Sequence, residues 1–215
     1  MTKRITHKEE PIRGTENSQQ YEEAHRGPAK IVYRALHKDI KALMPSGHYL
    51  EVGAGPGTLA AMIAEGNPGV HITAVDISPD MVAVAKSHIE ERNLQHNVHC
   101  AVADAKDAVA IESLGQFDLV YSAFSLHHWK DPGGCIGNLW NALKSDGILY
   151  IYDLKRVWWL YFLPFNNGFI ESVRASYMPN EIEGLFRNFG ITHYSITTLF
   201  PFFMQSAIAW KRGGP

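Results

Sequence analysis

Apolar residues in this chain follow two alternating patterns. Short apolar runs, typical of buried strands, fall at 49–52, 71–76, 98–102, 117–122 and 148–152. Between these runs, apolar residues recur every three or four positions, which predicts helices from 58, 79, 105, 132 and 179, with another over 21–44 ahead of the first strand. Regular alternation of strand and helix indicates a parallel sheet covered by helices.

The C-terminal part breaks this alternation. Two runs rich in β-branched and aromatic residues, 192–199 and 203–210, are separated by only a few residues. Such a short connection suits an antiparallel hairpin. We therefore predict an α/β fold, a doubly wound, Rossmann-like three-layer sandwich with a mostly parallel seven-stranded sheet and an antiparallel C-terminal hairpin strand. In such sheets ligands bind outside the carboxyl ends of the strands.

Composition narrows the class of protein. The 215 residues are 46% hydrophobic and 20% charged, with a formal charge of −2, so we expect one domain and no nucleic-acid partner. Cys100 and Cys135 lack metal-ligand spacing and are expected to be reduced thiols. The N-terminus lacks the apolar stretch of a signal peptide, and the longest apolar run, 157–165, is too short for a bilayer. We expect no transmembrane segment and a cytoplasmic location.

A glycine-rich loop follows the first strand, where residues 51–58 read EVGAGPGT. Glycines let the backbone approach a ligand closely at a helix N-terminus. The dinucleotide fingerprint GxGxxG requires a third glycine at 58, where this chain has threonine. The acid ahead of the loop instead suits a cationic ligand such as S-adenosyl-L-methionine (SAM), which carries an ammonium and a sulfonium. A turn that serves packing alone is the alternative.

At these residues the chain resembles the class I SAM-dependent methyltransferases. EVGAGPG matches their first motif, and AVDIS, VADAKD, FDLVYSAFSLHHW and LKSDGILYIYD resemble the later ones in the family's order. DLKR and SYMPNEIEGLF are similar to a small-molecule subgroup related to the quinone-biosynthesis methyltransferases. The resemblance covers roughly residues 45–210. It implies SAM as the cofactor and S-adenosyl-L-homocysteine as the product.

The resemblance also implies roles for the first two strand ends. Gly53, Gly55 and Gly57 would let the methionine and ribose parts of SAM lie on the backbone. Glu51 would orient the amino group through water, and Asp76 would accept both ribose hydroxyls, as a carboxylate can.

Further cofactor contacts are implied along the sheet. Asp104 would accept from the adenine amino group while the amide of Ala105 donates to the ring, although an aspartate before a helix also commonly serves as an N-cap. Ser122 would offer its carbonyl to the ammonium, and Ile77 and Met81 complete the set.

The acceptor side carries a weaker signal, because methyl transfer needs no fixed catalytic residue. His127 and His128 follow the fourth strand and are candidates for a general base or substrate contact, or for a structural loop role. Asp153 is either a pocket carboxylate or a loop anchor. Arg174 and Tyr177 are candidates for substrate contact or, more simply, surface residues. We find no convergent zinc ligands and predict no metal.

An aromatic segment lies between the fifth strand and the last helix. Trp158, Trp159 and Phe162 would line a lid over an apolar or aromatic acceptor, with Tyr21 as a further substrate contact. A homodimer interface and packing on the N-terminal helix are the alternatives.

These observations give a single methyltransferase domain over 1–215. It divides into an N-terminal helical cap (1–45), a SAM-binding core (46–156), the aromatic substrate cover (157–178) and the last helix with its hairpin (179–215). No proline-rich DPPY-like turn follows the fourth strand, so a small-molecule acceptor is favoured over nucleic-acid bases. A catalytically silent SAM-binding partner or sensor domain, and an NAD(P)-dependent oxidoreductase, are the competing hypotheses.

Overall fold

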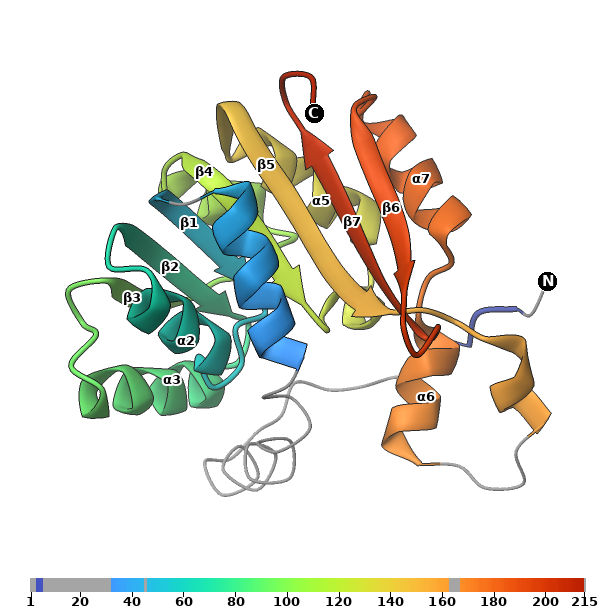
Figure 1. The fold of residues 1–215 in the computed structure, drawn as a ribbon, viewed down its shortest axis with the longest axis horizontal. Coiled ribbons are helices and arrows are strands. Elements are labelled where there is room, and N and C mark those ends of the chain that lie inside the picture. The colour runs from blue at the N-terminus through green and yellow to red at the C-terminus, as the bar shows by residue number, and fades with distance from the viewer. Residues whose placement is uncertain (1–2, 6–31, 45, 163–166, 215) are drawn as a thin grey trace.

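A central sheet with helices on both faces forms the fold in the computed structural model of the chain, which describes residues 3–5, 32–44, 46–162 and 167–214 (Figure 1). The strands are β1 (Gly47–Val52), β2 (Val70–Asp76), β3 (Val98–Val102), β4 (Phe117–Ala123), β5 (Leu143–Leu154), β6 (Tyr194–Leu199) and β7 (Met204–Trp210). The helices are one over 32–43 and α2 (Thr58–Gly66), α3 (Pro79–Glu91), α4 (Ala108–Ser113), α5 (Pro132–Asn141), α6 (Gly168–Ala175) and α7 (Pro179–Asn188). Two short 3-10 turns are η1 (Leu126–His128) and η2 (Trp158–Phe162).

The strand order is β3-β2-β1-β4-β5-β7-β6. The first five strands pair in parallel, and β7 is antiparallel to both of its neighbours. The predicted mostly parallel sheet with a C-terminal hairpin is therefore confirmed. The order along the chain reverses between β1 and β4, and this topological switch point is where such folds bind ligands.

Two apolar layers separate the sheet from its helices. On one face, the helix over 32–43, α2, α3 and α6 pack against side chains such as Tyr49 and Tyr150. On the other face, α4, α5 and α7 pack against Leu50 and Leu149. Successive strand residues point to opposite faces, so a strand that is covered on both sides reads as one continuous apolar run.

Some local features differ from the sequence predictions. Helix α6 was not expected inside the aromatic segment, although Asn167 caps it by accepting the N–H of Ile170 at 2.9 Å. Leu143 continues the apolar spacing of the helix that starts at 132, yet it begins β5. Phe189 continues the apolar spacing of α7, yet it is exposed at the end of that helix. The helix expected over 21–44 is described only over 32–43, and its earlier part lies outside the described residues.

An acidic side chain lies inside the fold near the end of β1. Glu51 is only 3% exposed, and its carboxyl group accepts hydrogen bonds from the Tyr121 hydroxyl at 3.1 Å and from the backbone of Ala60. Burial, reinforced by the nearby charge of Asp76, raises the pKa of Glu51 to about 8. The carboxyl group is therefore mostly protonated at neutral pH in the free protein.

This burial predicts a pH dependence of stability that Glu51→Gln should remove. An unfolded glutamate loses its proton near 4.5, whereas folded Glu51 keeps its proton up to about 8. Between these values the unfolded state binds fewer protons, so the free energy of unfolding should fall by up to ~1.4 kcal/mol per pH unit as pH rises. The stability of Glu51→Gln relative to wild type should therefore increase from pH 5 to pH 8 in urea unfolding.

The exposed Glu90 of α3 offers a matched control, because Glu90→Gln makes the same chemical change at the surface. Its stability should follow the wild-type pH profile. Parallel profiles for Glu51→Gln and wild type would show that Glu51 ionises normally in the folded state.

Candidate active site

The loop between β1 and α2 has a tightly constrained backbone. The N–H groups of Gly53 and Ala54 both donate to the carbonyl oxygen of Val75, at 2.9 and 3.0 Å. Gly53, Gly55 and Gly57 have φ values of 71°, 52° and 73°, in the left-handed region that favours glycine. This conformation turns the chain from the end of β1 directly into α2.

The three glycines of this loop differ in what surrounds them. A Cβ on Gly53 would lie 2.2 Å from the Ser125 hydroxyl, and one on Gly57 would lie 3.1 Å from the Cβ of Ala85 in α3. A Cβ on Gly55 would have no neighbour within 4 Å. The outer two glycines are therefore required by packing, whereas Gly55 borders open space in which a ligand could approach the backbone.

Asp76, at the end of β2, fastens the glycine loop. Its Oδ2 accepts the N–H of Gly55 at 2.8 Å, and its Oδ1 accepts the N–H of Ser78 at 2.9 Å. Burial raises the pKa of Asp76, while the backbone N–H groups of Ser78, Gly55 and Ile77 oppose that rise. One carboxylate thus links the first loop to the start of α3 and lies beside the open space at Gly55.

The remaining candidates of the cofactor side occupy different environments. Ile77 is exposed after β2, whereas Met81 is buried in α3 and donates its N–H to the Ser78 hydroxyl at 3.3 Å. Ser122 is buried in β4, and its hydroxyl donates to the carbonyl oxygen of Val52 at 2.9 Å, across to the end of β1.

Asp104 lies beyond the end of β3 and is exposed. Its carboxylate accepts the N–H of Lys106 at 2.9 Å, and the N-cap of α4 is Asp107, so the alternative role of Asp104 as an N-cap is wrong. The neighbouring Ala105 is buried, and its carbonyl oxygen accepts from the Asn138 side chain at 3.0 Å. Asn138 was not foreseen, because an isolated amide in a helix gives no sequence signal of such a contact.

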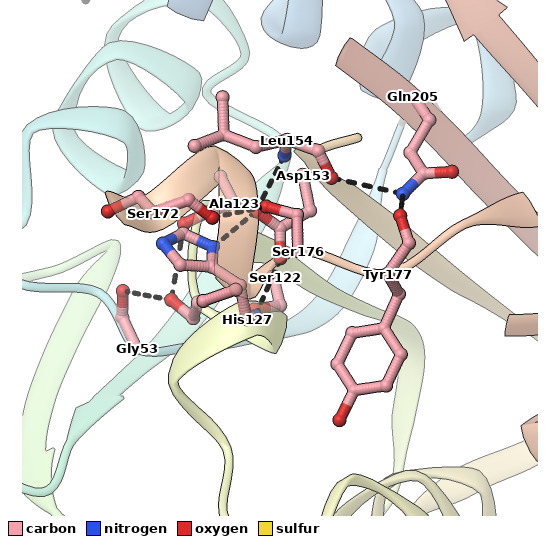
Figure 2. Close-up of polar contacts among 12 residues, drawn as sticks. Gly53, Ser122, Ala123, His127, Asp153, Leu154, Ser172, Ser176, Tyr177 and Gln205 are labelled. Carbon is pink, nitrogen blue, oxygen red and sulfur yellow. Dashed lines mark hydrogen bonds and ion pairs between the residues drawn. The ribbon is translucent and has the colours of Figure 1, made fainter. Parts of the chain in front are cut away.

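His127 and Asp153 form a buried pair between the ends of β4 and β5 (Figure 2). They are 6% and 1% exposed, and His127 Nδ1 lies 2.6 Å from Asp153 Oδ1. The backbone N–H of His127 donates to Asp153 Oδ2 at 2.9 Å, and the N–H of Leu154 donates to Oδ1 at 2.7 Å. Because a carboxylate only accepts hydrogen bonds, the ring proton of His127 is on Nδ1, and Nε2 is the nitrogen with a free lone pair.

The second histidine, His128, extends from this pair toward the cofactor side. It is exposed, and its ring centroid lies 3.9 Å from that of His127. Its charge opposes the rise in the pKa of Asp76 that burial causes. The two histidines therefore lie between the carboxylate at the end of β2 and the carboxylate at the end of β5.

The aromatic segment contributes mostly exposed rings. Trp158 and Phe162 are 66% and 77% exposed, with ring centroids 6.0 Å apart, and Trp159 is also exposed. Val157 and Leu160, next to these rings in the sequence, are buried. The sequence-predicted Tyr21 lies outside the described residues.

Beneath this segment lies a polar network that sequence reasoning missed in part. Arg156 is buried, donates to the Ser176 carbonyl at 2.9 Å and pairs with Glu181 at 2.6 Å. The buried Gln205 of β7 donates to the carbonyl oxygens of Leu154 and Tyr177, at 3.0 and 2.8 Å (Figure 2). The available sequence signal for Gln205 was its place, with Ser206, in an otherwise apolar run.

Across the ranges that the structure describes, no cluster of three or more histidine, cysteine or acidic side chains could hold a metal ion. Nor does any helix in those ranges have the length and apolar character needed to cross a membrane. Tyr177, considered a surface residue from the sequence, is in fact buried.

Comparisons with known proteins agree with this geometry. Residues 50–149 match the family described as "Methyltransferase domain". The demethylmenaquinone methyltransferase of Thermus thermophilus is 30% identical over 168 residues, which cover 72% of this chain and 74% of that protein. The ubiquinone biosynthesis O-methyltransferase of Xanthomonas campestris pv. campestris is 34% identical over 129 residues, covering 60% of this chain and 50% of that protein.

The chain spans about half the length of the first curated relatives that it matches. Among solved structures, the plantazolicin methyltransferase BpumL in complex with a triazolic desmethylPZN analogue and S-adenosylhomocysteine superposes with a TM-score of 0.70 at 15% identity, over 91% of this chain and 90% of that chain. This similarity shows a shared fold. With the relationship to the Thermus enzyme and the order of motifs along the sheet, it follows that the chain belongs to the class I SAM-dependent methyltransferases.

Proposed function

We propose that the chain transfers the methyl group of SAM to a hydroxyl group of a small aromatic or apolar acceptor, with His127 as the general base. The observation that carries this proposal is the 2.6 Å contact between His127 Nδ1 and Asp153 Oδ1. A hydroxyl oxygen must lose its proton when it gains a methyl group, so a base within reach lowers the barrier. A relative named as an O-methyltransferase supports an oxygen acceptor.

The residues at the glycine loop fit SAM, which supplies an electrophilic methyl group on a positively charged sulfur. Open space at Gly55 leaves the backbone accessible, and acidic side chains lie at or just beyond the ends of three neighbouring strands, at Glu51, Asp76 and Asp104. Their carboxyl oxygens can accept hydrogen bonds from the ammonium, the ribose hydroxyls and the adenine amino group, respectively. An ammonium beside Glu51 would also favour the ionised form of its carboxyl group.

The other proposed contacts follow the same edge of the sheet. The proposed set adds the carbonyl of Ser122 for the ammonium, the amide of Ala105 for the adenine, and the apolar side chains of Ile77 and Met81 beside the nucleoside. All four lie within or just beyond the carboxyl-end segments of β2, β3 and β4.

On the acceptor side, Asp153 orients the base and His127 removes the proton. Asp153 accepts a hydrogen bond from the Nδ1 proton, so Nε2 is the ring nitrogen that can accept the proton of the hydroxyl group. The acceptor oxygen then forms a bond to the methyl carbon while the carbon–sulfur bond breaks, and S-adenosyl-L-homocysteine leaves. Alignment of the acceptor can supply roughly 7–11 kcal/mol by proximity.

The exposed rings of Trp158, Trp159 and Phe162 are proposed as the cover of an apolar acceptor. Their clustering beside α6, near the carboxyl end of β5, supports this role. A homodimer interface at the same rings is the second hypothesis, because exposed aromatic side chains commonly mark contact surfaces.

The central experiment supplies methyl-labelled SAM with a panel of phenols, catechols, aromatic amines and thiols. We expect label on phenolic hydroxyls. Label on amines alone would contradict the oxygen acceptor, and SAM binding without any transfer would favour the catalytically silent SAM-binding domain.

Asp76→Ala should weaken SAM binding by more than about tenfold, because hydrogen bonds to a charged acceptor are lost. Calorimetry with S-adenosylhomocysteine and with its 2′-deoxy analogue gives a sharper test. Wild type should discriminate between the two ligands, whereas Asp76→Ala should not. The exposed Asp146 provides the control variant, Asp146→Ala, with wild-type affinity. Equal discrimination by Asp76→Ala and wild type would disprove the ribose contact.

His127→Gln and Asp153→Asn should each lower kcat by about a hundredfold or more while the SAM affinity stays within twofold. The first change removes the base, and the second removes the carboxylate that selects its tautomer. The exposed His96 gives the control His96→Gln, which should be fully active. A loss of turnover in His128→Gln but not in His127→Gln would show that His128, and not His127, is the base.

A further inference from the structure

The N-terminal residues 3–5 lie against the segment that follows β5. The Tyr161 hydroxyl of η2 donates to the carbonyl oxygen of Lys3 at 2.9 Å, and the N–H of Ile5 donates to the carbonyl oxygen of Arg174 at 3.2 Å. These two backbone contacts flank Arg4 on both sides. Lys3 and Ile5 are exposed, whereas Arg4 is half-buried, so Arg4 is the residue of this segment that faces inward.

The Arg4 guanidinium contacts three separate parts of the chain. Its Nε donates to the carbonyl oxygen of Ala175 at 2.5 Å, and its Nη2 donates to the carbonyl oxygen of His127 at 3.1 Å. Its central carbon lies 4.0 Å from the centroid of the Tyr177 ring, within the range of a cation–π interaction. One side chain thus joins α6, the segment after α6 and η1.

The contact with α6 follows from the chemistry of helix ends. The last carbonyl groups of a helix have no partner within the helix, and they carry partial negative charge. Arg174 and Ala175 are the last two residues of α6, and their carbonyl oxygens accept from Ile5 and Arg4. A planar guanidinium has several N–H groups at fixed angles, so it can serve this helix end and a second carbonyl together, unlike a lysine ammonium.

The contact with His127 completes the fixation of that residue. Asp153 of β5 accepts hydrogen bonds from the backbone N–H and from the ring Nδ1 of His127. Arg4, which lies 123 positions earlier in the sequence, donates to the carbonyl oxygen of His127. The backbone of His127 is therefore held at both its N–H and its C=O groups, which limits rotation of the peptide units that aim the ring.

We propose that Arg4 is a positioning residue of the acceptor site, which fixes the orientation of His127 by linking its carbonyl group to the end of α6. The inference rests on the proposed role of His127. Arg4 acts through His127, and its guanidinium makes its contacts with backbone carbonyls and the Tyr177 ring. Residues 3–5 are thereby part of the acceptor side of the site.

The direct test measures exchange of the His127 Nδ1 proton with solvent by NMR in the full-length protein with S-adenosylhomocysteine added. The signal is assigned by its absence from His127→Gln. Exchange should be about tenfold faster in Arg4→Ala, the effect of losing roughly 1.4 kcal/mol of hydrogen bonding. Lys3→Ala, a change of the exposed neighbouring side chain, should exchange at the wild-type rate. Equal rates in Arg4→Ala and wild type overturn the proposal.

Arg4→Lys keeps the test decisive if Arg4→Ala fails to fold. Lysine retains the charge over Tyr177 and one carbonyl contact, so exchange should be faster than in wild type by about threefold. A wild-type rate in Arg4→Lys shows that the fork of the guanidinium is not needed and overturns the proposal.

A kinetic measurement separates this proposal from the proposed function. With an acceptor that wild type methylates, Arg4→Ala should lower kcat by about tenfold and leave the SAM affinity within twofold. A purely structural role would instead lower thermal stability without lowering kcat at unchanged SAM affinity. That result contradicts the role of Arg4 in positioning His127. If wild type methylates no acceptor, the proposed function fails, while the proton-exchange measurement still decides the role of Arg4.

Discussion

The Asp76 carboxylate is the constraint on which the cofactor side depends. It accepts one N–H from the glycine loop and one from the start of α3, at 2.8 and 2.9 Å, and so joins the two connections that follow β1 and β2. Packing holds the same loop from outside, because the Ser125 hydroxyl and Ala85 leave no room for side chains at Gly53 and Gly57. The loop conformation is thereby set by the fold, and Gly55 faces open space.

The site as a whole joins two halves of the sheet at its topological switch point. The ends of β1, β2 and β3 supply acidic side chains and bare backbone, which suit the proposed binding of a cationic nucleoside. The ends of β4 and β5 supply the buried pair of His127 and Asp153. Because β1 and β4 are neighbours, these two groups of residues lie at the same edge of the sheet, and the ring of His128 is tilted against that of His127.

Much of this arrangement could be predicted from the sequence, for identifiable physical reasons. Strands buried on both faces produce apolar runs, and the short link between 192–199 and 203–210 favoured a hairpin, so a mostly parallel sheet with an antiparallel C-terminal hairpin could be predicted. The glycine loop could be found because positions that need a positive φ favour glycine, whereas the role proposed for Asp76 came from the resemblance to the methyltransferases.

Other features depend on contacts between distant residues, which no local pattern records. The pairing of His127 with Asp153 and the reach of Arg4 to His127 join positions 26 and 123 residues apart. Helix α6 was missed because aromatic residues dominate its neighbourhood, although Ile170 and Val173 have helical spacing and are buried. The exposed Phe189 shows the limit of periodicity, since it lies just past the end of α7, where the helical repeat no longer applies.

A crystal structure with S-adenosylhomocysteine bound tests the central claim most directly, because it shows where the sulfur lies relative to the two halves of the site. The nucleoside should lie over Gly55 with its ribose at Asp76, and the sulfur should face a cavity reached by His127 Nε2. A nucleoside bound elsewhere, or a sulfur turned away from His127 with no path between them, would contradict it.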